Sequence, residues 1–288
     1  MTDRNGARAW APGTCGELVE GTWEGKPFLV TCPIDLGSTM EVYLDGEKEV
    51  PKSLNKTGRA LDLVKKKLNL PDLGLGFVRE SKLPPGKGMG SSTSDIAAAI
   101  LAAARLFERE ISAEEIARLA LSIEPSDGIM FPGVVLFDHR GGHWLERLGD
   151  PPPFNILVLD PGGVVDTLEF NRQEKLDYYN RKKEPQVRLA LQLVKEGLQE
   201  GDLEKVARGA TESALANQEL LPKPHLNQVL NWAEDVGALG VNVAHSGTVM
   251  GLFLPPDGNH PEEVRTFLQK RRPHWKYYAA KMISGGLR

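Results

Sequence analysis

The chain has 288 residues, enough for one large domain or two modest ones with a substantial core. Its 35 basic and 39 acidic side chains give a formal net charge of −4, so no global positive field favours nucleic acid or an anionic membrane as a partner. Two cysteines, Cys15 and Cys32, form neither a disulfide framework nor a standard zinc pattern. Without a membrane-length apolar run or an apolar leader, we expect a soluble cytoplasmic protein.

The first half of the chain predicts strands that alternate with helices. Apolar runs and apolar–polar alternation mark the strands, and apolar residues at a spacing of three or four mark the helices. The predicted elements are strands at 28–32, 39–44, 75–79 and 133–138 and helices at 58–68, about 91–107 and 112–124. Ser92 with Asp95 and Ser112 with Glu115 have capping-box spacing, and Pro125 stops the last helix.

The second half mixes the same two kinds of element. The prediction is a strand at 154–159, a flexible-looking stretch to about 184, helices near 185–199, 202–218, 225–236 and 261–271, and strands at 241–245, 248–254 and 275–282. The three prolines of 150–153 suit a stiff linker, so we divide the chain into domains 1–150 and 151–288. This order predicts an α+β sandwich. The basic runs 181–183 and 270–272 are expected to be solvated helix ends.

A glycine-rich turn over 84–95 is the most informative stretch. Its glycines allow close backbone approach, and the helix that follows offers unpaired N–H donors and a partial positive charge to a phosphate. The spacing is neither that of a Walker A motif nor that of a dinucleotide-binding fingerprint. From the pattern alone, a phosphate-binding loop and a capped tight turn are about equally well supported.

Two acidic residues follow the predicted helix at 112–124. Glu124 falls at the end of that helix, and Asp127 lies in a turn after Pro125. Carboxylates placed in this way can bind Mg²⁺ and accept a proton from a hydroxyl. The pattern alone favours a surface acid and an ordinary Asp–Gly turn.

Two further segments are rich in small residues. The segment 242–251 places His245 and Ser246 between two apolar strands, where a backbone can approach a ligand closely. By itself, His245 indicates a structural histidine rather than a catalyst. The segment 11–21 sets Cys15 between two glycines, which predicts a β-turn within a sheet rather than a reactive thiol.

These four segments, in this order, resemble motifs of the GHMP kinases. Pro84 to Thr93 resembles the P-x-x-x-G-L-G-S-S-A phosphate loop of that superfamily, 11–13 its N-terminal motif and 244–251 its C-terminal glycine-rich motif. The resemblance implies an α+β, two-domain fold with a ribosomal protein S5 domain 2-like N-terminal part and a ferredoxin-like C-terminal α/β sandwich. It also implies ATP and Mg²⁺ as cofactors. Thr14 stands where many members carry a basic residue.

A narrower resemblance is to the L-threonine kinases of cobalamin biosynthesis. It is carried by the blocks C-G-E-L at 15–18, C-P-I-D at 32–35, G-M-G-S-S-T-S-D-I-A-A at 88–98, S-I-E-P-S-D at 122–127, L-P-K-P at 221–224 and N-V-A-H-S-G at 242–247. This resemblance implies transfer of the ATP γ-phosphate to the side-chain hydroxyl of free L-threonine, for the aminopropanol linker of cobalamin. A kinase for homoserine or another small hydroxylated metabolite and a silent nucleotide-binding regulator remain as alternatives.

The resemblance also assigns roles to individual residues. The implied ATP-binding residues are Pro85, Gly86, Lys87, Gly88, Met89, Gly90, Ser91, Ser92 and Thr93. Ser92 and Glu124 are the implied Mg²⁺ ligands, and Asp127 is the implied base or orienting group for the hydroxyl. Lys87 is expected to add positive charge over the phosphates. For the substrate, we expect Glu17 or Asp35 at the ammonium and His245 with Ser246 at the carboxylate. The sequence does not set an oligomeric state.

Overall fold

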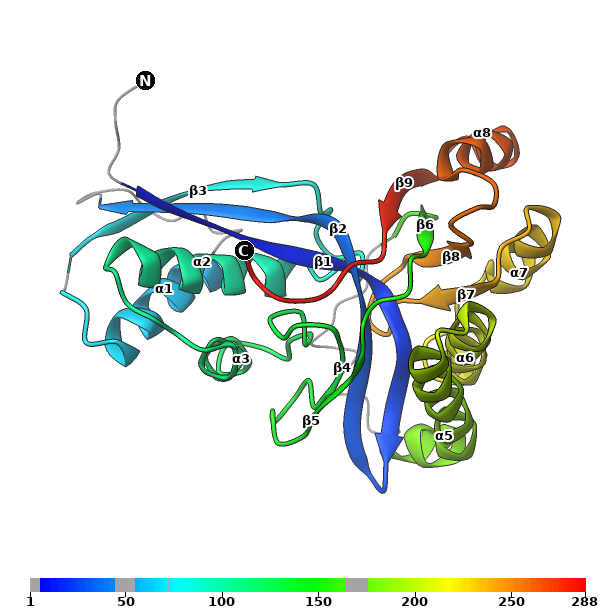
Figure 1. The fold of residues 1–288 in the computed structure, drawn as a ribbon, viewed down its shortest axis with the longest axis horizontal. Coiled ribbons are helices and arrows are strands. Elements are labelled where there is room, and N and C mark those ends of the chain that lie inside the picture. The colour runs from blue at the N-terminus through cyan, green and yellow to red at the C-terminus, as the bar shows by residue number, and fades with distance from the viewer. Residues whose placement is uncertain (1–5, 45–54, 72, 164–175) are drawn as a thin grey trace.

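The computed structural model describes residues 6–44, 55–71, 73–163 and 176–288 (Figure 1). Its strands are β1 (Gly6–Trp23), β2 (Lys26–Leu44), β3 (Leu75–Ser81), β4 (Val134–Phe137), β5 (Leu145–Gly149), β6 (Asn155–Asp160), β7 (Gly240–Val243), β8 (Met250–Leu254) and β9 (Lys276–Lys281). Its helices are α1 (Asn55–Lys67), α2 (Ser91–Leu106), α3 (Ala113–Leu121), α5 (Leu176–Glu200), α6 (Leu203–Ala216), α7 (Leu226–Asp235) and α8 (Pro261–Arg271), with a 3₁₀ turn η2 (Asn217–Glu219).

The strands pair antiparallel in the order β5-β4-β2-β1-β7-β8-β6-β9, and β3 pairs with the second half of β2. The long hairpin β1–β2 runs through both halves of the molecule (Figure 1). Its register shifts at three places between Pro12 and Val19, and Gly16 has a left-handed φ of 53°. These bulges bend β1 and let it meet β7 at a single pair, Glu17 opposite Val243.

Helices cover the sheet in two groups, and three apolar clusters form the core. Helices α1, α2 and α3 pack with the outer parts of β1 and β2. Helices α5 and α6 pack on the other end of β1, and α7 and α8 pack on the strands β6–β8. Figure 1 shows the two groups separated by the β1–β2 hairpin. The candidate site described below lies where these two groups of helices meet, because residues of α1, α2 and the turn after β7 line one cavity.

Most predicted elements are confirmed to within a few residues. The capping box of Ser112 and Glu115 is present at the start of α3. The sequence did not reveal β5, and the segment 11–21 is part of the bulged strand β1 rather than a turn. Helix α5 begins at Leu176, nine residues before the expected start, and contains Pro185. Within the flexible-looking stretch predicted up to 184, residues 164–175 lie outside the described residues.

The mixed α/β architecture agrees with the predicted fold class, and the domain boundary at 150–153 stays a prediction. The C-terminal tail returns to the first half of the chain, where Arg288 and Trp10 exchange backbone hydrogen bonds of 2.7 and 2.9 Å. Gly285 likewise forms an isolated bridge with Gly133. The end of the second half therefore completes the packing of the first.

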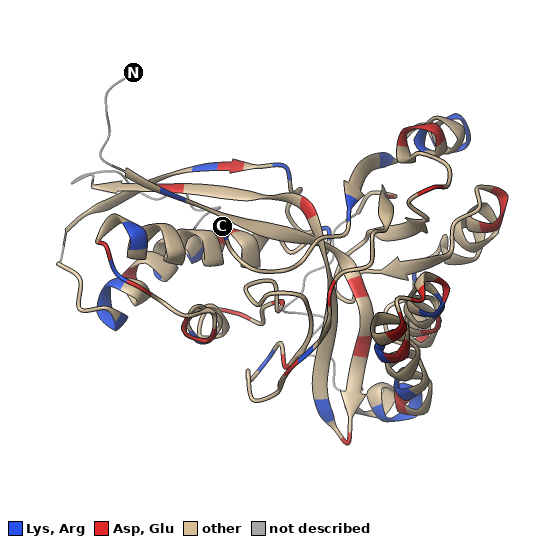
Figure 2. Ribbon diagram, in the orientation of Figure 1, with Lys and Arg blue, Asp and Glu red and all other residues tan. Residues whose placement is uncertain are grey.

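Basic and acidic residues are interspersed along the helices of the C-terminal half. Figure 2 shows Lys and Arg interspersed with Asp and Glu along the helices of the C-terminal half. This mixing matches the small net charge of the sequence. Within the described ranges, none of the helices combines the length and apolarity needed to cross a membrane.

Candidate active site

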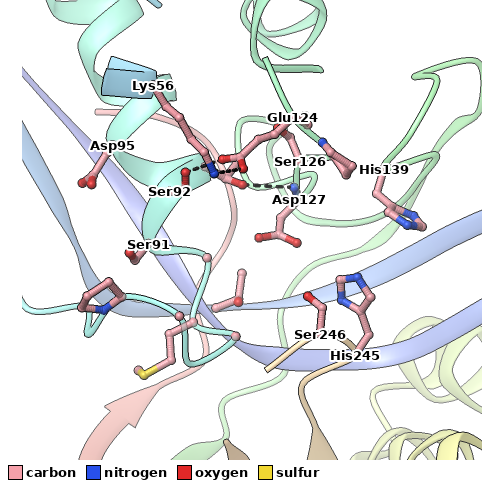
Figure 3. A pocket seen from close by; sticks show the side chains of 18 of the residues that line it. Lys56, Ser91, Ser92, Asp95, Glu124, Ser126, Asp127, His139, His245 and Ser246 are labelled. Atoms are coloured by element: carbon pink, nitrogen blue, oxygen red, sulfur yellow. Dashed lines mark hydrogen bonds and ion pairs between the residues drawn. The ribbon is translucent and has the colours of Figure 1, made fainter. Parts of the chain in front are cut away.

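A cavity of about 730 Å³ lies between the phosphate loop, the turn that carries Glu124 and Asp127, and the small-residue segment 242–251. This volume is within the range typical of small-molecule sites. Most of the sequence-predicted residues line it: Glu17, Pro85, Gly86, Gly88, Met89, Gly90, Ser91, Ser92, Thr93, Glu124, Asp127, His245 and Ser246. Figure 3 shows Asp127, His245 and Ser246 facing one another across the cavity. Residues separated by more than 200 positions in the sequence thus share one pocket.

The glycine loop delivers the N-terminus of α2 to the cavity. Gly90 is the N-cap residue and has a left-handed φ of 67°, which suits glycine, and the helix receives no side-chain cap. The predicted capping box of Ser92 and Asp95 is therefore wrong. The Asp95 carboxylate instead accepts hydrogen bonds from Ser38 Oγ at 2.5 Å and from Arg79 Nε at 2.8 and 2.9 Å. The first residues of α2, 91–93, line the cavity, and an uncapped helix N-terminus offers N–H groups that can bind an anion.

The phosphate loop packs directly against the turn between β7 and β8. The backbone N–H groups of Thr248 and Val249 donate to the Lys87 carbonyl at 3.0 and 3.2 Å. A Cβ added at Gly88 would overlap that of Ala244 and lie 2.9 Å from the Gly247 Cα. The two motifs therefore require small residues because their backbones touch, which explains the composition of both segments.

The Lys87 side chain points away from the phosphate side of the loop. Its Nζ donates to Gly163 O at 2.6 Å and lies 3.2 Å from Oδ1 of the buried Asp160 at the end of β6. Lys87 is not among the residues that line the cavity. Its charge links the loop to the C-terminal half, and this arrangement does not support the expected contact with phosphates.

Ser92 and Glu124 meet at one end of the cavity. The Ser92 hydroxyl donates to Oε1 of Glu124, and Nζ of Lys56 binds Oε2 of the same carboxylate (Figure 3). Glu124 lies just beyond α3, where its N–H still donates to the Ala120 carbonyl at 3.1 Å. A hydroxyl and a carboxylate held together are hard oxygen ligands of the kind that Mg²⁺ prefers.

Asp127 lies beside the phosphate loop. A Cβ added at Gly90 would be 3.1 Å from Oδ2 of Asp127, and the Asp127 N–H donates to Thr93 Oγ1 at 3.4 Å. Burial, followed by the negative charge of Glu17, raises the pKa of Asp127 to about 7. A carboxylate with this pKa next to a phosphate site is suited to accept a proton near neutral pH.

Buried charged side chains bind the backbone of the turn at 244–248. Glu17 accepts a hydrogen bond from the His245 N–H at 2.7 Å, and Lys223 Nζ donates to the Gly247 carbonyl at 2.6 Å. Burial raises the pKa of Glu17 to about 8 and lowers that of Lys223 to about 8. Burial also lowers the pKa of His245, whose ring Nδ1 lies 3.2 Å from Glu17 Oε1. These charges hold the backbone of the 244–248 turn in place.

Lys183 extends the cluster, and its predicted solvation is wrong. The side chain is buried, its Nζ donates to Asn217 Oδ1 at 2.8 Å, and its charge acts on Glu17 and Glu20. The sequence did not indicate that Lys183 is buried, because 181–183 is a basic run like many exposed ones. Lys183 reaches these partners only because α5 packs beside β1 in the folded protein.

Lys223 is expected to be important for stability. Lys223→Met leaves the buried Gly247 carbonyl without its donor, at a cost of about 1–3 kcal/mol in unfolding free energy. The matched control is Lys182→Met, which removes an exposed ion pair with Glu219 and is expected to change the unfolding free energy far less, because solvent screens such a pair. Urea unfolding of both variants measures the difference, and equal stabilities would contradict a supporting role for Lys223.

Two predicted residues have other environments. Asp35 is exposed, does not line the cavity, and accepts a hydrogen bond from the Lys281 N–H at 2.8 Å, which ties β2 to β9. Cys15 is buried, and its thiol donates to Asn242 Oδ1 at 3.6 Å. Burial raises the pKa of this thiol, which keeps it protonated and supports the structural interpretation of Cys15.

The cavity lining also includes residues that no sequence pattern indicated. Lys56 and Arg59 on α1 and Arg79 on β3 bring positive charge to the cavity, and His139 after β4 forms part of its wall. The His139 and His245 rings lie 5.4 Å apart, and burial lowers the pKa of His139 well below its usual value. No local motif marks these residues, because each reaches the site from a different element.

The chain is similar to known proteins over its whole length. Family models named GHMP kinases N terminal domain and GHMP kinases C terminal match residues 55–132 and 194–274. An L-threonine kinase from Salmonella typhimurium is 33% identical over 99% of this chain and 96% of its own length. One from Citrobacter freundii is 32% identical, with 98% and 99% covered.

Solved structures support the same fold. A homoserine kinase from Cytophaga hutchinsonii superposes with a TM-score of 0.75 at 16% identity, over 100% of this chain and 98% of that one. The Methanococcus jannaschii mevalonate kinase gives 0.75 at 16% identity, over 96% and 98%. The two-domain architecture expected from the motifs is therefore confirmed. The chain belongs to the GHMP kinase family.

Proposed function

We propose that this chain is an ATP-dependent kinase that phosphorylates the side-chain hydroxyl of free L-threonine. The observation that carries this proposal is the similarity to L-threonine kinases across 98–99% of the chain. The cavity supports it chemically, because it combines a phosphate loop, a hydroxyl–carboxylate pair and a carboxylate of raised pKa. The product, O-phospho-L-threonine, would then be used to make the aminopropanol linker of cobalamin.

The proposed ATP site is formed by the phosphate loop and the first turn of α2. Phosphoryl transfer depends on positioning and charge neutralisation more than on covalent catalysis. Backbone N–H groups from Gly86 to Thr93 are the proposed donors to the phosphate oxygens. We leave the Lys87 ammonium out of this set, because Asp160 and the Gly163 carbonyl hold it.

We propose Ser92 and Glu124 as the protein ligands of Mg²⁺. Their oxygens already converge at the edge of the cavity, which fits a hard divalent cation. Among the described residues there is no group of three or more His, Cys, Asp or Glu able to hold a metal. Mg²⁺ commonly takes its other ligands from phosphates and water. A structurally similar protein at 14% identity and a TM-score of 0.71 was solved with AMPPCP and magnesium.

Asp127 is the proposed proton acceptor for the threonine hydroxyl. In this role its carboxylate takes the proton as the hydroxyl oxygen bonds to the γ-phosphorus and the bond from phosphorus to the β–γ bridging oxygen breaks. Glu17 is the proposed partner of the substrate ammonium, and His245 with Ser246 the proposed partner of its carboxylate. Asp35 is left out because it lies outside the cavity. A bound ammonium would favour ionised Glu17 and offset the burial that raises its pKa.

Turnover with a panel of hydroxy amino acids tests the proposal. We expect Mg·ATP-dependent phosphorylation of L-threonine, with kcat/KM about 10–200-fold above that for L-serine, since one methyl group is worth about 1–3 kcal/mol in a pocket. Mass spectrometry of the products and ADP release measure the transfer. A preference for L-homoserine would replace the proposed substrate, and the absence of transfer to every acceptor would favour the nucleotide-binding regulator.

A further inference from the structure

A lysine of α1 reaches into the metal end of the cavity. Lys56 lies in the first turn of α1, and its Nζ binds Oε2 of Glu124, 68 residues away in sequence. The other oxygen of this carboxylate accepts the Ser92 hydroxyl. Figure 3 shows the Lys56 side chain extending from α1 to these two residues. The ammonium therefore uses the same carboxylate that the proposed function gives to Mg²⁺.

A lysine and a divalent cation compete for such a carboxylate. Two cations within bonding distance of one carboxylate repel each other, and the ammonium gains far less from the pair than a divalent ion does. The Lys56 side chain is 49% exposed, whereas that of Glu124 is only 13% exposed. Lys56 is thus the partner with room to move, and Glu124 is the partner fixed by the turn after α3.

Two other cations near the cavity are paired with carboxylates that are not proposed metal ligands. Arg79 binds both oxygens of Asp95 through its Nε, and Lys87 is held by Asp160 outside the cavity lining. Arg59 is one turn further along α1 and also lines the cavity. Of these, Lys56 is the cation that pairs with a proposed metal ligand. Once displaced from Glu124, its ammonium still lies over the cavity, close to the N-terminus of α2.

We propose that Lys56 alternates between two partners. It neutralises Glu124 when no metal is bound there, and it binds the ATP phosphates when Glu124 binds the metal. This inference rests on the proposed function, because it takes Ser92 and Glu124 as the Mg²⁺ ligands. It adds a nucleotide-binding residue on α1 that also lowers the affinity of the site for a metal without nucleotide.

The test separates the two halves of this role. Mn²⁺ binding without nucleotide is measured by electron paramagnetic resonance, and ATP binding with saturating Mg²⁺ and no acceptor by calorimetry. Lys56→Met is expected to tighten Mn²⁺ binding about two- to fivefold, because a competing ion pair is gone. It is expected to weaken Mg·ATP binding about 10–100-fold, because the charged donor that contacts the phosphates once the metal is bound is gone. Lys66→Met, an exposed lysine on the same helix outside the cavity lining, is the matched control and should change neither.

Opposite effects on the two ligands would distinguish this role from a simple phosphate contact or from damage to the fold. Unchanged or weaker Mn²⁺ binding by Lys56→Met, with Glu124→Gln weakening it, overturns the inference and leaves the proposed metal site intact. If Glu124→Gln and Ser92→Ala both leave Mn²⁺ binding unchanged, the proposed metal site itself fails. Unchanged ATP binding by Lys56→Met overturns the phosphate half of the role.

Discussion

Asp127→Asn is expected to lower kcat by about 10²–10⁴-fold if this carboxylate accepts the proton of the substrate hydroxyl. Asparagine keeps the size of the side chain and the N–H donated to Thr93, but it cannot take a proton. The unfolding free energy and the affinity for ATP should change little, because Asp127 lies beside the phosphate loop without capping it. Steady-state kinetics with ATP titration measures the split, and near-normal kcat in Asp127→Asn would refute the base.

The pH profile gives a second measurement on the same residue. Only the ionised carboxylate accepts a proton, and burial raises the pKa of Asp127 to about 7. We therefore expect kcat/KM of the wild type to rise as pH increases through about 7 and then to level off. Glu17, with a pKa raised to about 8 by burial, titrates nearby, so the assignment needs variants. The limb near pH 7 should vanish in Asp127→Asn and persist in Glu17→Gln.

Gly88→Ala is expected to damage both stability and ATP binding. Gly88 has a φ of 80°, and an added Cβ would overlap that of Ala244. The left-handed conformation costs about 1–2 kcal/mol for a non-glycine residue, and overpacking adds about 1–3 kcal/mol. Because the loop must move away from the 244–248 turn, its phosphate donors move too, and such misplacement can cost about 10²-fold in catalysis.

Gly25→Ala is the matched control for this prediction. Gly25 has a similar φ of 75° in the turn between β1 and β2, and an added Cβ meets nothing within 4 Å. It should show only the conformational cost of about 1–2 kcal/mol, with normal ATP affinity. Urea unfolding and calorimetric ATP titration compare the two variants. Equal losses in both would contradict the packing of the phosphate loop on the β7–β8 turn as the cause.

Interactions between residues close in sequence were the most predictable part of this protein. The capping box of Ser112 and Glu115 needs only a spacing of three residues, and it is present as expected. Ser92 and Asp95 have the same spacing, yet Asp95 binds Ser38 and Arg79 instead. An ion pair with Arg79 and a hydroxyl donor offer a carboxylate more than a single backbone N–H does. A local pattern therefore predicts a cap only when no stronger distant partner is available.

The charged residues show the same limit for the site. Glu17, Glu124 and Asp127 were expected in the site, and all three line the cavity. Lys56 and Lys223 were not expected, because a single lysine in a helix or beside a proline resembles many surface lysines. Their partners, Glu124 and the Gly247 carbonyl, lie 68 and 24 residues away. Electrostatic energy depends on spatial distance and burial, and neither can be read from sequence spacing.

The family, the order of most helices and strands, and the phosphate loop could be inferred from the amino-acid sequence, because glycine conformations, apolar periodicity and short motifs act over a few residues. Which charged side chains pair depends on how distant segments pack in the folded protein. The bulged strand β1 carries Glu17 to β7, and the contact between loop and turn directs the Lys87 ammonium to Asp160. Such pairings arise only when distant segments pack and exclude water, which makes a buried charge depend on its neighbours.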